Sequence, residues 1–140
     1  MDVKRIAIGT VVGGVSMFVA AYLIWAIALP AMSIGNNLWE GAFEAAGVAR
    51  ESMILWASFL SNVTSAALVT LAIEKNGLST IGSGVKIGMV VGFLLWLGVD
   101  LAYYANTTIF DLTSTIVDPL LATIHFGIGG GAIAAVLGRR

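Results

Sequence analysis

The stretch Ile6–Leu29, IAIGTVVGGVSMFVAAYLIWAIAL, contains no charged residue. It is longer than the roughly 20 apolar residues that an α-helix needs to cross the hydrocarbon core of a bilayer. Lys4 and Arg5 precede it, and Pro30 follows it, where a proline ends a helix because it removes a backbone donor. The stretch therefore predicts a first membrane span.

The composition of the whole chain agrees with a lipid environment. Of its 140 residues, 59% are hydrophobic and 11% are charged, and the mean hydropathy is +0.97, which lies outside the range of soluble globular domains. The net charge is −1 and no basic stripe is present, so nucleic acid is excluded as a partner. The absence of cysteine excludes thiolate metal sites, and the single histidine argues against a bis-histidine haem. We predict no cofactor and no metal site.

Three further spans follow from the same argument, at residues 53–73, 86–104 and 116–137. The second span is free of charge, the third is interrupted by Asp100, and the fourth carries Asp118 and His125. The sequence thus predicts an all-α polytopic membrane protein, with residues 1–140 forming one domain of four transmembrane helices.

The basic residues predict the orientation. Lysine and arginine gather at the N-terminus, in the second loop and at the C-terminus, whereas the first loop carries only Arg50 and the third loop carries none. Cytoplasmic loops are enriched in these residues. We therefore expect an integral protein of the bacterial inner (cytoplasmic) membrane, with the N-terminus and the C-terminus both cytoplasmic and with an acidic outer face.

The first outer loop carries a helix signal of its own. Asn37 is followed three residues later by Glu40, which resembles a capping box. Trp39 and Phe43 share one side of the helix that would begin there, and tryptophan prefers the headgroup region. This pattern favours a helix lying flat in the membrane interface over a solvated surface helix.

Glycines recur every four residues in three of the spans, a spacing that lets helix backbones approach closely. The positions are Gly9 and Gly13; Gly84, Gly88 and Gly92; and Gly127 and Gly131. Close packing must supply much of the association between helices in lipid, because the hydrophobic effect is absent there. We interpret these positions as helix contacts, and their number favours a homo-oligomer.

Polar residues inside the spans are the candidate site. Asp100, His125 and Asn62 each lie about 13 or 14 residues from the basic residue at the cytoplasmic end of their own span, or roughly 20 Å at 1.5 Å per residue. This predicts one polar layer in the outer half of the membrane. Tyr103 and Tyr104 follow Asp100 by one turn, and Asp118 shares a stripe with His125.

Two interpretations of this layer stay open. In the functional one, Asp100 and His125 form a proton- or cation-handling pair, while Asn62, Asp118 and the two tyrosines complete a binding site, because ionisable groups at this depth are costly. In the structural one, the same side chains only hydrogen-bond one another and hold the helices in register. The tyrosine and the three tryptophans that remain in the spans are interpreted as membrane-interface anchors or packing residues; they are Tyr22, Trp25, Trp56 and Trp96.

Three segments resemble a bacterial family of small four-span membrane proteins that is catalogued only as a domain of unknown function. They are Gly13 to Pro30, Asp118 to Gly127, and the closing run from Gly131-Ala132-Ile133 to Leu137-Gly138-Arg139. The resemblance covers the order of the spans and the glycine-rich last helix, while the longer acidic first loop departs from the pattern. It implies a compact bundle and transfers no site residue.

Three functions follow, in order of preference. The first is an oligomeric transport or permeation protein with a proton- or cation-responsive polar site. The second is a structural or accessory subunit that docks onto a larger membrane complex through its glycine seams. The third is a small membrane-embedded enzyme that uses His125 and Asp100 as base and orienter, which ranks last because no catalytic nucleophile or metal set accompanies them.

Overall fold

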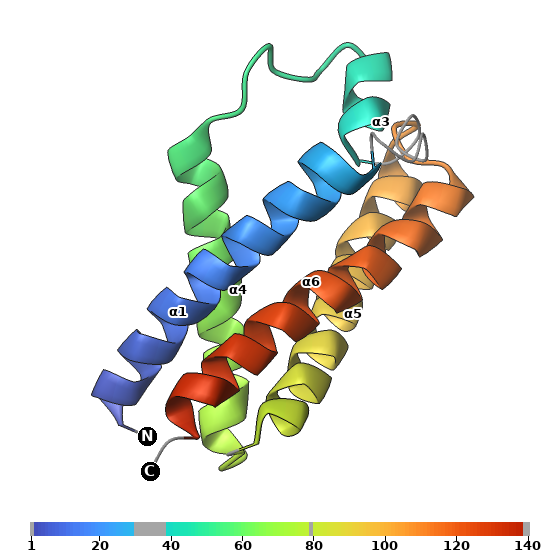
Figure 1. Ribbon diagram of the computed structural model, residues 1–140. Coiled ribbons are helices and arrows are strands. Elements are labelled where there is room, and N and C mark those ends of the chain that lie inside the picture. Colours follow the sequence, from blue (N-terminus) through green and yellow to red (C-terminus); the bar gives the residue numbers. More distant parts are fainter. Residues whose placement is uncertain (1, 30–38, 79, 139–140) are drawn as a thin grey trace.

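The computed structural model describes residues 2–29, 39–78 and 80–138, and this part of the chain is helical with short connections. Its elements are α1 (Val3–Ala21), the π-helix η1 (Tyr22–Ala28), α3 (Trp39–Ala45), α4 (Leu55–Lys75), α5 (Ile81–Asn106) and α6 (Leu112–Leu137). Figure 1 shows α1, α4, α5 and α6 running side by side along one bundle, with α3 at the end opposite the termini.

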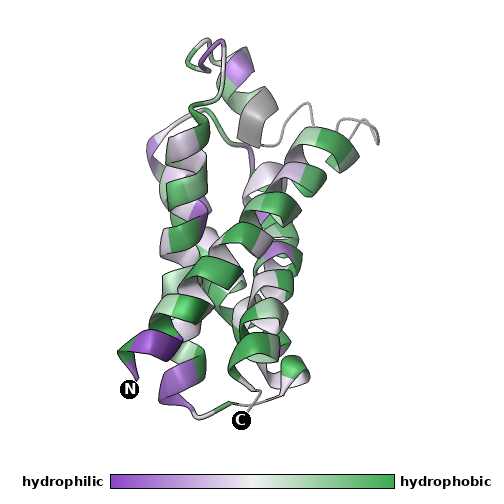
Figure 2. Cartoon of the chain, turned by 60° about the vertical axis from the view of Figure 1, so that its left-hand side comes forward, coloured by the Kyte–Doolittle hydropathy of each residue, from purple (hydrophilic) through white to green (hydrophobic). Residues whose placement is uncertain are grey.

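Four helices are long and apolar enough to cross a membrane, as the sequence predicts. They are Val3–Ala28, Leu55–Lys75, Ile81–Asn106 and Leu112–Leu137. Figure 2 shows hydrophobic residues covering most of their length, while hydrophilic residues gather toward the ends of the bundle and at a few positions within it. The outward side chains include Val11, Val90, Leu94, Leu120 and Ile124, all of them exposed. A surface this apolar is suited to lipid, so the chain is an integral membrane protein.

Three helices begin earlier than the sequence predicts, because a polar side chain caps each start. Asp2 accepts a hydrogen bond from the backbone N–H of Lys4, so α1 begins at Val3. The hydroxyl of Thr80 accepts a hydrogen bond from the backbone N–H of Ser83, so α5 begins at Ile81 and Lys86 lies inside it rather than at its start. The carboxylate of Asp111 accepts from the N–H of Ser114, so α6 begins at Leu112. Such caps satisfy donors that the first turn leaves unpaired. The connection between α5 and α6 is therefore only residues 107–111.

Helix α6 lies at the centre of the packing. Buried residues make up 56% of its most apolar 18-residue window, against 17% for α5, and it packs against α1, α4 and α5. The hydrophobic core joins side chains of α1, α4 and α6, namely Met17, Ala66, Val69, Ile73, Phe126, Ile133 and Leu137. The polar residues of α6 consequently face the interior of the bundle.

The glycine seams are contacts between helices of this one chain. The sequence predicted helix contacts at these positions but did not decide between helices of one chain and helices of different subunits. A Cβ at Gly9 would lie 2.6 Å from Thr70 of α4, and one at Gly92 would lie 2.5 Å from the Cβ of Phe126 of α6. Gly127 and Gly131 of α6 meet Met89 and Val85 of α5 in the same way. These seams are occupied within the chain, so the homo-oligomer stays a prediction that needs another surface.

The connection between the first and second spans contains the expected helix, α3. Its Phe43 packs edge to face against Tyr103 and Phe110, with ring centroids 6.0 and 5.9 Å apart. The helix thus docks on the ends of α5 and α6. The capping residue Asn37 and the side chain of Trp39 lie outside the described residues, and the depth of α3 in the interface stays a prediction.

Candidate proton site inside the bundle

Four of the six predicted site residues are buried among the helices. The exposed fractions are 7% for Asn62 of α4, 0% for Asp100 of α5, and 3% and 5% for Asp118 and His125 of α6. Polar side chains at this depth are expected to face protein rather than lipid. All four face protein here.

His125 joins three helices. Its Nε2 lies 2.9 Å from the backbone carbonyl oxygen of Met17 on α1 and 3.0 Å from Oδ1 of Asn62 on α4. The amide nitrogen of Asn62 donates to the carbonyl of Ser58, which fixes Oδ1 as the atom that faces the histidine. Both neighbours of Nε2 are acceptors, so Nε2 carries a proton and donates it. The other ring nitrogen, Nδ1, is buried and has no hydrogen-bond partner in the described part of the chain.

Asp100 and Asp118 form the second feature, which we call the acid pair. The Asp118 carboxyl group is the ionisable neighbour that interacts with Asp100. Neither oxygen of Asp100 has a hydrogen-bond partner of ordinary geometry among the described residues, although the side chain is fully buried. Buried polar groups are almost always hydrogen-bonded, and an unpaired buried charge is strongly destabilising. Asp100 is therefore the less satisfied member of the acid pair, since Asp118 accepts a hydrogen bond from Trp25.

The register of α5 against α6 explains why Asp100 meets Asp118 and not His125. Gly92 packs on Phe126, and because the two helices are antiparallel, eight residues further toward the outer end brings Asp100 opposite Asp118. His125 lies seven residues deeper along α6, about 10 Å at 1.5 Å per residue. The predicted pairing of Asp100 with His125, and the placement of both at one depth, are therefore wrong. These two predictions assumed that Lys86 and Arg139 lie at the same membrane boundary, and the register of α5 against α6 contradicts that assumption.

Trp25 of η1 contacts both Asp118 and His125, which lie about 10 Å apart along α6. Its indole N–H donates to Oδ1 of Asp118 at 3.3 Å, and its ring meets that of His125 edge to face, with centroids 5.3 Å apart and planes at 77°. The interpretation of Trp25 as an interface anchor or packing residue did not include the hydrogen bond to Asp118. The sequence offered only an indirect signal, a tryptophan whose N–H needs an acceptor when buried. Trp56, by contrast, is 71% exposed, as an anchor should be.

The two tyrosines have other surroundings. Tyr103 packs against the rings of Phe43 and Phe110 near the outer end of the bundle, and Tyr104 is 45% exposed. Neither location is the buried environment of the acid pair. Their assignment as site residues rested on following Asp100 by one turn, which placed their backbones close but did not fix their side chains.

The rim of the bundle at the end opposite the termini has a separate pocket of about 430 Å³, lined by Ala42, Ala45, Ala46 and residues 108–111. No member of the acid pair lines it. Within residues 2–29, 39–78 and 80–138, no three histidine, aspartate or glutamate side chains are grouped to hold a metal ion. The buried polar cluster, rather than the rim, therefore carries the unusual chemistry. No protein-family model, curated protein or solved structure matches this chain.

Proposed function

We propose that this protein is a small membrane transport protein that passes protons across the bilayer, with the acid pair as the group that takes up and releases the proton. The observation that supports it best is the fully buried Asp100, which lies beside the carboxyl group of Asp118 inside the bundle.

Charge balance supports a bound proton. Two adjacent carboxylates in a medium of low dielectric constant repel each other, so such pairs share a proton or bind a cation. Both carboxyl oxygens of Asp100 are buried inside the bundle. A proton needs no coordination shell, whereas a metal cation needs several oxygen ligands.

The accessory-subunit alternative predicts a satisfied interior. If the polar layer only held helices in register, each buried polar atom would be expected to have a partner. The Nε2 side of His125 meets that expectation through Asn62 and Met17. Asp100 does not, because its partner is the carboxyl group of Asp118, and two carboxyl groups form a hydrogen bond only when they share a proton.

Proton flux into reconstituted vesicles tests the proposal. Purified protein is placed in liposomes that contain a trapped pH-sensitive dye, and a potassium gradient with valinomycin imposes an inward-negative potential. We expect wild-type protein to acidify the vesicles above the protein-free rate, and Asp100→Asn and Asp118→Asn each to lower that flux at least about tenfold. Asp111→Asn, the same change at an exposed helix cap, should leave the flux unchanged.

Two results would reject the proposal. Wild-type vesicles that acidify no faster than protein-free ones would rule out proton transport. Folded Asp100→Asn and Asp118→Asn variants with wild-type flux would remove the acid pair from the path and favour the accessory-subunit role. The experiment is then repeated with sodium in place of protons as the driving ion, to distinguish proton transport from metal-cation transport. Sodium uptake without acidification would mean that the pair binds a metal cation.

A further inference from the structure

The π-helical segment η1 is the irregular part of the first span. It covers Tyr22–Ala28, follows α1 without a break, and none of its residues is fully buried. The segment contains neither proline nor glycine, so its sequence does not forbid an ordinary α-helix. π-Turns inside α-helices are rare and occur frequently at functional sites.

The winding of η1 decides which side chain faces α6. Met17 and Ala20 mark the inward face of α1. At 100° per residue, a continued α-helix would place Ile24 within about 20° of Met17 and Trp25 about 80° away. A π-helix has roughly 4.4 residues per turn, or about 80° per residue, and this carries Trp25 to within about 10° of Met17.

The burial of Leu29 supports this angular position of the η1 side chains. The residue is 6% exposed, although a continuous α-helix would turn it about 120° away from Met17. The π-helical turns bring it back to the inward face, in line with Trp25. The extra width of η1 therefore has one specific result, which is that the Trp25 indole reaches Asp118 and His125.

We propose that η1 is a gate for the acid pair, which exchanges between the π-helical winding and an α-helical one. In the π-helical winding Trp25 covers Asp118 and lies between the acid pair and His125. In the α-helical winding Ile24 replaces Trp25 on the inward face and the hydrogen bond to Asp118 breaks. The carboxyl groups of the acid pair then become accessible. Trp25 is thus a positioning residue, and this inference rests on the proposed function only for what passes the gate.

Labelling of the two carboxyl groups tests the gate without any transport measurement. Dicyclohexylcarbodiimide is an apolar reagent that adds to protonated carboxyl groups inside membranes, and mass spectrometry of peptides gives the labelling rates of Asp100 and Asp118. Trp25→Phe keeps an aromatic ring and removes the N–H donor. We expect the acid pair of this variant to be labelled about fivefold faster than that of wild type, the factor that follows from losing one ordinary hydrogen bond.

Deletion of Leu23 tests the opposite state. The deletion lets a continuous α-helix place Trp25 about 20° from Met17 and Leu29 on the same face, so the gate is closed in the only winding available. We expect labelling several-fold slower than wild type. Tyr22→Phe is the matched control, because it alters an exposed aromatic residue of the same segment and should label at the wild-type rate.

The gate is rejected if Trp25→Phe labels at the wild-type rate, or if the folded deletion variant labels as fast as wild type. If the deletion variant does not fold, the comparison of Trp25→Phe with Tyr22→Phe decides the question alone. Failure of the gate is distinguishable from failure of proton transport. Faster labelling of Trp25→Phe in a protein without proton flux would keep the gate and reject the transport function.

Discussion

The Nε2 atom of His125 lies 3.0 Å from Oδ1 of Asn62, which joins the last helix of the bundle to α4. The orientation of the Asn62 amide is fixed by its hydrogen bond to Ser58. Together with the backbone carbonyl oxygen of Met17, this amide oxygen determines which nitrogen of the histidine carries the proton, because only a donor can face two acceptors.

This arrangement predicts a single tautomer for His125. We expect ¹⁵N NMR of histidine-labelled protein in bilayers to show a protonated Nε2 and an unprotonated Nδ1, since Nδ1 is buried without a partner among the described residues. The chain has one histidine, so the signal is unambiguous. Asn62→Leu should weaken or shift the Nε2–H signal, while Ser61→Ala on the exposed side of α4 should not. A protonated Nδ1 in wild type would contradict the hydrogen-bond geometry.

The seam between α5 and α6 predicts a cost for side chains at Gly88. A Cβ there would collide with the backbone carbonyl of Phe126, which cannot move aside as a side chain can. We expect Gly88→Ala to lower the free energy of unfolding in detergent by about 2 kcal/mol, the usual cost of overpacking. Gly98→Ala on the same helix meets nothing within 4 Å, so it should be neutral or slightly stabilising. Equal stability of the two variants would mean that α5 and α6 pack less closely than described.

The end of the bundle near the termini is held by Arg5. Its guanidinium group contacts Glu74 of α4 at 2.8 Å and donates to the backbone carbonyl of Leu137 at the end of α6. We expect Arg5→Gln to lower the free energy of unfolding by about 1 to 2 kcal/mol, because one change removes an ion pair and a cap of α6.

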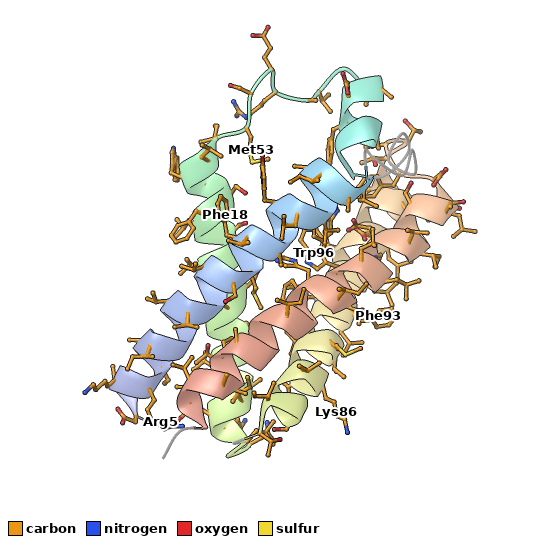
Figure 3. All side chains as sticks on the ribbon, viewed as in Figure 1. Arg5, Phe18, Met53, Lys86, Phe93 and Trp96 are labelled. Atoms are coloured by element: carbon orange, nitrogen blue, oxygen red, sulfur yellow. The ribbon has the colours of Figure 1, made fainter. Side chains whose placement is uncertain are left out.

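Lys86→Gln is the matched control for Arg5→Gln, since it also removes one positive charge. Figure 3 shows Lys86 pointing away from the bundle, whereas Trp96 lies toward the interior. The control should stay within about 0.5 kcal/mol of wild type. A similar loss in both variants would indicate an effect of net charge and not of the Arg5 contacts.

Asp111 makes the start of α6 sensitive to acid. Hydrogen bonds from the backbone and side chain of Ser114 hold the pKa of the Asp111 carboxyl group below its usual value. A carboxylate with a lowered pKa stabilises the fold above its ordinary pKa of about 4, and this contribution is lost as the pH falls through the lowered value. Asp111→Asn keeps a capping oxygen and should remove this pH dependence, whereas Asp111→Ala should cost about 1 kcal/mol at neutral pH. Thermal unfolding between pH 3 and 7 provides the measurement, and identical pH profiles in wild type and Asp111→Asn would contradict the assignment.

The orientation of the bundle is testable with reporters. Figure 1 shows both termini at the same end, and the connection between α4 and α5 joins the helix ends there. The distribution of basic residues predicts that this end is cytoplasmic. A reporter fused after Arg140 and one inserted at Gly77, where the backbone φ is 62° and open space surrounds the residue, should both report the cytoplasm. A periplasmic signal from either would reverse the assignment of inside and outside.

Hydropathy alone determined the number of spans and their approximate positions, because the cost of placing charge in hydrocarbon acts on each helix separately. The glycine spacing likewise predicted the contacts of Gly88 and Gly92, since close approach in lipid requires a missing side chain. The burial of Asp100, Asp118 and His125 followed from the same cost.

The tertiary structure alone decided which polar groups meet. The register of α5 against α6 is seen where Gly88 and Gly92 of α5 pack against Phe126 of α6. A shift of two turns in this register separates a partnership of Asp100 with His125 from one with Asp118. The role of Trp25 depends on the π-helical winding of η1, which turns one residue in place of its neighbour toward α6. Hydropathy does not predict which of the two residues faces α6, because Ile24 and Trp25 are both compatible with lipid and with packing. Only the facing helix, with an acceptor at Asp118, distinguishes them.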